Sequence, residues 1–133
     1  MPQITLEYTG NLEAPDFRKL FSELHGILAE TGGVRLDNCK SRALRRDDFF
    51  VGDGADRHAF VHLTLRLLAG RDPNWKRDVG QKFLDVLIRA FRQDIEHKDV
   101  QITVTIEDIV RATYFKYPEG TLGDSADVGR KAS

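Results

Sequence analysis

Residues 58–68 read HAFVHLTLRLL, and this stretch decides the fold. The odd positions are apolar and share one face of an extended chain: Ala59, Val61, Leu63, Leu65 and Leu67. The even positions share the opposite face: Phe60, His62, Thr64 and Arg66. An alternation with a period of two predicts a β-strand that packs one face against a core.

The segment before this strand contains a strand, a helix and a second strand. Residues 3–8 alternate as a strand, and residues 39–47 mix apolar and basic side chains as a second one, with 49–51 as a candidate extension. Between them, apolar residues follow helical spacing: Phe17, Leu20, Phe21, Leu24, Ile27 and Leu28. Pro15–Asp16 suits the first turn of this helix and Gly32–Gly33 suits its end.

The segment after the strand repeats the same order. A helix is expected from Pro73 through Ile95, and residues 100–107 alternate as a final strand. The chain therefore reads β-α-β-β-α-β, which predicts a two-layer α+β fold with two helices on one face of a four-stranded sheet. We expect one domain over 1–116, with 113–115 as a candidate edge piece, and a polar tail over 117–133.

The face of the sheet away from the helices is expected to be semi-polar. It would carry Thr5, His62, Thr64, Thr103 and Thr105. This face is too mixed to stay bare and too polar for a second helical layer. We therefore expect it to pack against further subunits in an oligomer.

Composition restricts the class of protein. The 133 residues carry a net charge of −1, which gives no general attraction to nucleic acid or to acidic membranes, and neither partner is expected. No apolar run has the length of a membrane span, and the first residues lack the basic and apolar regions of a signal peptide, so we expect none. Cys39 is the only cysteine, which suits a cytoplasmic protein.

The basic residues are the strongest candidates for chemistry. The four histidines lack metal-ligand spacing, and no phosphate-binding glycine loop or serine nucleophile motif is present, so we expect no metal or cofactor. Lys40, Arg42 and Arg46 share one strand face by parity, and Arg71 follows the strongest strand. These side chains form either a solvated basic surface or a pocket for a carboxylate substrate, which the guanidinium fork matches.

Three stretches carry a resemblance to a known family: MP at 1–2, KSR at 40–42, and HAFVHLTLRLLAGR at 58–71. From Pro2 to about residue 116 the chain resembles the 5-carboxymethyl-2-hydroxymuconate isomerase family of the tautomerase superfamily. The resemblance implies a tautomerase-like subunit that forms a homotrimer. It also implies that Pro2 is catalytic, as a terminal secondary amine, once Met1 is removed.

The chemistry implied by this resemblance is physically reasonable. An α-amine titrates near pH 8, and burial and nearby cations lower its pKa, so that a neutral nitrogen can move a proton at neutral pH. The implied substrate is a dienol polycarboxylate of homoprotocatechuate breakdown, ketonised without metal or cofactor. Arg71, Lys40 and Arg42 would anchor its carboxylates, and Phe49 or Phe50 would wall the pocket. Lys40 stands where the family commonly has an arginine, so it keeps the charge and loses the bidentate fork.

Two alternative functions remain open at the level of sequence. The same proline could serve a hydratase, a dehalogenase or a decarboxylase acting on unsaturated acids. A trimeric protein on the same scaffold could also bind such an acid without turning it over.

Overall fold

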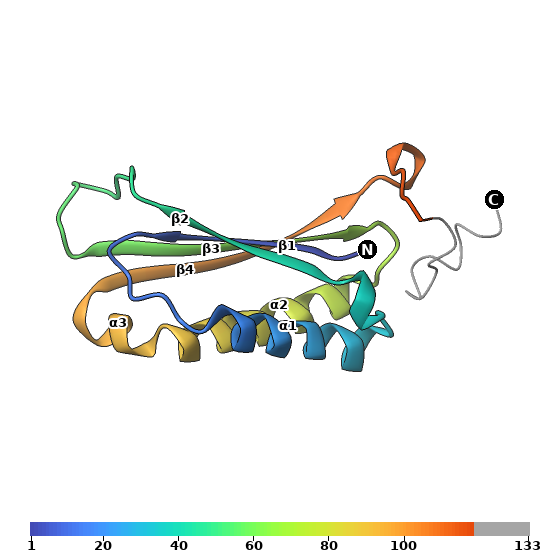
Figure 1. The fold of residues 1–133 in the computed structure, drawn as a ribbon, viewed down its shortest axis with the longest axis horizontal. Helices are drawn as coiled ribbons and strands as arrows, with labels where there is room; N and C mark the ends of the chain where they lie inside the picture. The colour runs from blue at the N-terminus through green and yellow to red at the C-terminus, as the bar shows by residue number, and fades with distance from the viewer. Residues whose placement is uncertain (119–133) are drawn as a thin grey trace.

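The computed structural model describes residues 1–118, which form one four-stranded sheet and the helices beside it. The elements in chain order are β1 (Gln3–Thr9), α1 (Phe17–Gly32), η1 (Leu36–Asn38), β2 (Lys40–Arg46), β3 (His58–Leu68), α2 (Pro73–Ala90), α3 (Arg92–His97), β4 (Asp99–Ile109) and η2 (Arg111–Thr113). Both long helices cover the same face of the sheet (Figure 1). The α+β fold predicted from the sequence is confirmed.

The sheet has the order β2-β1-β3-β4, so the two β-α-β units meet where β1 pairs with β3. This central pairing is antiparallel and places Thr5 opposite Thr64. The two outer pairings are parallel, as their helical connections require: β1 with β2, and β3 with β4. As a result, β1 and β2 begin at the end of the sheet where β3 and β4 finish.

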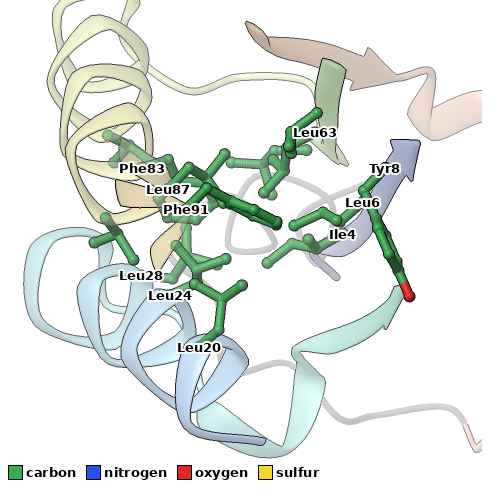
Figure 2. Close-up of a cluster of buried hydrophobic side chains, with 14 of the residues drawn as sticks. Ile4, Leu6, Tyr8, Leu20, Leu24, Leu28, Leu63, Phe83, Leu87 and Phe91 are labelled. Carbon is green, nitrogen blue, oxygen red and sulfur yellow. The ribbon is translucent and has the colours of Figure 1, made fainter. Parts of the chain in front are cut away.

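The core lies between the sheet and the two long helices. In Figure 2, Ile4 and Leu6 of β1 point toward side chains from α1 and α2, including Leu24 and Phe83. The odd positions of β3 are between 0% and 2% exposed, as the alternation predicts. Burial of these apolar side chains is the main favourable contribution to folding.

The helix boundaries follow from local chemistry. The Asp16 side chain accepts a hydrogen bond from the Lys19 amide (3.2 Å) and caps α1, which ends at Gly33 with φ 65°, a left-handed conformation that suits glycine. Asp72 caps α2 through the Asn74 amide (2.7 Å), with Pro73 as the first helical residue. The end of α1 and the start of α2 confirm the expectation, whereas Pro15 and Asp16 lie just before the first turn of α1 rather than in it.

Three local expectations were wrong. Residues 49–51 do not extend β2, which ends at Arg46 where its carbonyl accepts the Gly10 amide (2.8 Å). The second helix breaks at Phe91, whose backbone leaves the helical conformation (φ −109°, ψ 20°), and the short α3 follows with Ile95 37% exposed. Residues 113–115 form no edge strand, because the chain turns through η2 and leaves Phe115 87% exposed.

The last part of the predicted tail, 119–133, lies outside the described residues. The boundary at residue 116 therefore stays a prediction. In residues 1–118, neither long helix carries a continuous apolar stretch of the kind a bilayer crossing needs.

Candidate functional site

The candidate site lies at the end of the sheet where β1 and β2 begin. The Lys40 amide donates to the Pro2 carbonyl (3.1 Å), which joins the first residues of these parallel strands. α1 finishes and α2 starts at the same end, close to the chain's N-terminus (Figure 1). The register of the sheet therefore gathers Pro2, the start of β2 and the loop after β3 at one end of the molecule.

Met1 and Pro2 are both buried at this end. Met1 is only 3% exposed, and its carbonyl acylates the Pro2 nitrogen. An amide nitrogen has its lone pair delocalised and cannot act as a base. Removal of Met1 would both free the amine and vacate the space that the methionine side chain fills beside it.

Arg71 lies just beyond the end of β3, half-buried in the loop that leads into α2. Its Nη1 donates to the carbonyl of Gly32 (2.6 Å), at the C-terminus of α1. Its guanidinium carbon also lies 4.6 Å from the centre of the Trp75 ring, a cation–π contact. Arg71 is therefore held against the end of α1, at the same end of the sheet as Pro2.

Lys40 and Arg42 lie on the face of the sheet that no helix covers, beside Gln3 and Thr5 of β1. Lys40 Nζ donates to the Asn38 carbonyl (3.1 Å). Arg42 Nη2 donates to the Gln3 side-chain carbonyl (2.6 Å). The parity that places these two cations on one face is confirmed, and both lie within the first residues of β2, near Pro2.

Phe49 and Phe50 lie at the opposite end of the sheet. Their loop joins the end of β2 to the start of β3, at the far side of the molecule from the N-terminus (Figure 1). Phe49 packs its edge against Phe60, with ring centroids 6.5 Å apart, while Phe50 is 77% exposed. Within one subunit the structure does not bring these rings to Pro2.

Arg111 is a basic residue at the Pro2 end that the sequence analysis did not single out. It follows β4 in the turn η2, and its Nε donates to the Ala69 carbonyl (2.8 Å). Its terminal nitrogen lies beside Gly70, where an added Cβ would come within 3.7 Å of it. Arg71 and Arg111 therefore flank the same loop. Only the pairing of β3 with β4 brings them together, and the order of the strands is not visible in the sequence.

His25 and Ser41 form a further polar contact near this end. His25 of α1 and Ser41 of β2 are joined between Nε2 and Oγ (2.6 Å), where the helix crosses the edge strand. Burial lowers the pKa of His25 below its ordinary value. This contact ties α1 to the strand that carries Lys40 and Arg42.

The lowered pKa of His25 predicts a pH-dependent stability. The unfolded chain binds a proton more readily than the folded one, so the free energy of unfolding should fall as the pH drops below about 6.5 and on through the folded pKa. Urea unfolding between pH 8 and pH 5 measures this slope, which H25Q should flatten modestly. An H25Q slope equal to that of wild type contradicts the assignment.

Other regions carry less chemistry. A groove of about 350 Å³ lies between the start of α1 and the end of α2, spanned by the Glu23–Arg89 ion pair (2.6 Å), away from Pro2. In residues 1–118, His, Cys, Asp and Glu side chains form no group of three that could hold a metal ion. Pro2, Lys40, Arg42 and Arg71 therefore lie at the same end of the sheet, with Lys40 and Arg42 on its uncovered face and Arg71 against the C-terminus of α1.

Comparisons with known proteins agree with this architecture. The Escherichia coli protein 5-carboxymethyl-2-hydroxymuconate Delta-isomerase is 28% identical over 117 residues, covering 87% of this chain and 93% of that protein. The crystal structure of a 5-carboxymethyl-2-hydroxymuconate isomerase from Deinococcus radiodurans R1 is 30% identical, with a TM-score of 0.75. The alignment covers 86% of this chain and 87% of the Deinococcus radiodurans chain.

The fold also extends to more distant structures. The structure of a fused 4-OT wild type symmetric trimer has the same fold, with a TM-score of 0.66 and 14% sequence identity. The alignment covers 87% of this chain and 92% of the 4-OT chain. A sequence model described as 5-carboxymethyl-2-hydroxymuconate isomerase matches residues 2–119, most of the 133-residue chain. This protein is therefore a member of the 5-carboxymethyl-2-hydroxymuconate isomerase family, with a tautomerase-like fold.

Proposed function

We propose that this protein is a cofactor-independent isomerase that ketonises a dienol polycarboxylate, such as 5-carboxymethyl-2-hydroxymuconate, in the catabolism of aromatic compounds. The observation that supports this most is that Pro2 and several cationic residues lie at the same end of the sheet. The Lys40 amide donates to the Pro2 carbonyl, Arg71 lies in the loop after β3 at the same end, and Arg111 of η2 donates to the Ala69 carbonyl of that loop. Family membership supplies the reaction type.

In the proposed mechanism, the Pro2 amine moves one proton. After Met1 is removed, the neutral ring nitrogen takes the proton of the 2-hydroxyl group, and the O–H electrons form the carbonyl at C2. The double bonds shift along the chain, and the same proton returns to carbon as a new C–H bond. The proline ring restricts the direction of the lone pair, which a primary amine on a freely rotating chain end does not. The cytoplasm suits this proposal, since methionine aminopeptidase acts there.

The cations have two tasks in this mechanism. Arg71, Lys40 and Arg42 hold carboxylates of the substrate, and their charge favours the negative charge that develops on the 2-oxygen. The same positive charge disfavours protonation of the Pro2 amine. The same side chains would thus bind the substrate and lower the pKa of the Pro2 amine.

A homotrimer is part of the proposal. Polar and charged side chains line the uncovered face of the sheet, among them His62, which contacts Thr103 (2.6 Å). The fused 4-OT structure that shares the fold is a symmetric trimer. Phe49 and Phe50 lie far from Pro2 in their own subunit, so they could wall the pocket only from a neighbouring copy. Light scattering should give a trimeric mass, and a fully active monomer would contradict this assembly.

Product analysis tests the proposed reaction. The mature protein is mixed with a 2-hydroxymuconate dienol, and ultraviolet absorbance and NMR follow the products, with a 3-haloacrylate as a parallel substrate. Rapid appearance of the conjugated ketone supports the isomerase. Addition of water, release of halide or loss of CO₂ would identify a hydratase, a dehalogenase or a decarboxylase instead. Tight binding without any turnover would identify a binding protein.

Arg71→Ala should weaken binding of acidic substrates specifically. A charge-assisted hydrogen bond contributes about 1.5–3 kcal/mol, so KM for the dienol acid should rise about 10- to 150-fold. The KM of Arg71→Lys should lie between those of wild type and Arg71→Ala, because lysine keeps the charge and loses the bidentate guanidinium fork. The fully esterified dienol, which carries no carboxylate, is the control substrate, and its KM should stay nearly constant. An unchanged KM for the acid would remove Arg71 from the site.

A further inference from the structure

Trp75 holds Arg71 on one side, and both side chains are anchored to the end of α1. The indole Nε1 donates to the carbonyl of Thr31 (3.1 Å), while Arg71 Nη1 donates to the carbonyl of the next residue, Gly32 (2.6 Å). The guanidinium lies over the indole ring, 4.6 Å from its centre. Two side chains from the start of α2 and its loop thus bind consecutive carbonyls at the C-terminus of α1.

Gly32 leaves the space that this arrangement needs. A Cβ on Gly32 would come within 2.5 Å of Trp75 Cζ2 and 3.0 Å of Arg71 Nη1. Real Cβ atoms do not approach other atoms at the shorter of these distances, so any larger residue would displace the indole. The absence of a side chain at this position lets the ring and the guanidinium sit directly on the helix end.

The geometry of the contact suits an arginine that binds an anion. A carboxylate binds guanidinium in its plane, through N–H groups along an edge, whereas an indole packs against its face. Because the indole ring offers no hydrogen-bond acceptor, its contact with the guanidinium does not occupy the N–H groups that a carboxylate would bind. It restricts the long Arg71 side chain to a narrow range of rotamers, and this lowers the entropy lost when a ligand binds.

We propose that Trp75 is the positioning residue of Arg71, and that it sets the affinity of the site for carboxylate-bearing ligands. This inference rests on the proposed function for its substrate class, since it assumes that Arg71 meets a carboxylate. Trp75 itself acts only through the guanidinium.

Fluorescence tests the proposal without any turnover, because Trp75 is the only tryptophan in the chain. Adipate, a saturated dicarboxylate, is the probe. Adding it to the mature protein should change the Trp75 emission along a saturable curve, and Arg71→Ala should abolish that change. An emission that adipate leaves constant in wild type would overturn the proposal. A saturable change in a protein that ketonises nothing would leave the positioning role standing and reject the isomerase.

Kinetics separate positioning from a general structural role. Trp75→Leu removes the ring, and the loss of about 0.5–2 kcal/mol of cation–π attraction should raise KM for the dienol acid about 2- to 30-fold. Trp75→Phe keeps a ring face and should restore most of the affinity. KM for the fully esterified dienol should not change in either variant. Equal KM increases for acid and ester would show a structural role and overturn the proposal.

A double-mutant cycle gives a third readout. In an Arg71→Ala background, Trp75→Leu should cause no further rise in KM for the acid, because the residue that Trp75 positions is gone. Independent, additive effects of the two substitutions would contradict the proposal. Gly32→Ala offers a variant that keeps both side chains, and it should reproduce the KM increase of Trp75→Leu by displacing the indole. A Gly32→Ala enzyme with the KM of wild type would count against the arrangement.

Discussion

Replacing Pro2 with alanine is expected to lower kcat/KM for the dienol acid by about 10²- to 10⁴-fold, the range found when a general base is lost or impaired. Alanine at this position still permits removal of Met1, so the chain keeps a free amine. That amine is primary and rotates freely, and it lacks the ring that orients the lone pair. The loss should appear in kcat, with a smaller change in KM, because the carboxylate anchors remain.

Pro15→Ala is the matched control for this experiment. Pro15 lies just before α1, at the opposite end of that helix from Gly32, and its substitution should leave kcat/KM within about twofold of wild type, as is usual for residues away from a site. Intact-mass measurement must confirm that Met1 is absent from all three proteins. A Pro2→Ala enzyme as fast as wild type would reject the proline mechanism.

Retention of Met1 should abolish the activity. With Met1 in place the Pro2 nitrogen is an amide, and the buried methionine, 3% exposed, fills the space beside it. Cell-free synthesis without methionine aminopeptidase yields the capped chain, and intact mass reports the extra residue. Its rate of ketonisation should equal the uncatalysed rate.

Processing of this capped chain provides the control. Because Met1 is buried in the folded protein, the aminopeptidase should act efficiently only during synthesis or on unfolded chains. When it is added at that stage, the activity should rise in proportion to the fraction of chains that have lost Met1. Full activity in a preparation that mass spectrometry shows to be entirely capped would contradict the mechanism.

Much of the fold could be predicted because the local signals agree with one another. The alternation in β3 matches the burial of its odd positions. Asp16 caps the start of α1 with its side chain, and Gly33 ends the helix in a left-handed backbone conformation. The break at Phe91 could not be predicted, because Ile95 continues the apolar spacing of α2 although it belongs to α3. Apolar spacing reports which face is buried and does not report a bend in the helix axis.

The candidate site was less accessible to sequence reasoning. Arg71 was a candidate from its place after the strongest strand, whereas the role of Pro2 came from a resemblance, and only the strand order shows that the two lie at one end of the sheet. Trp75 and Arg111 were missed because their contacts are with backbone carbonyls of distant segments, at Thr31 and Ala69. Such carbonyls have no signature in the side-chain sequence.

The state of the Pro2 nitrogen is the central claim, and ¹⁵N NMR of protein labelled only at proline measures it directly. The chain has four prolines, and only a terminal amine titrates, because amide nitrogens do not. We expect one proline nitrogen to titrate with a pKa below the value of about 8 that is usual for an α-amine. The same pKa should appear on the acidic limb of the kcat/KM profile. A nitrogen that stays protonated through pH 9, or a mature protein without any titrating proline, would contradict the account.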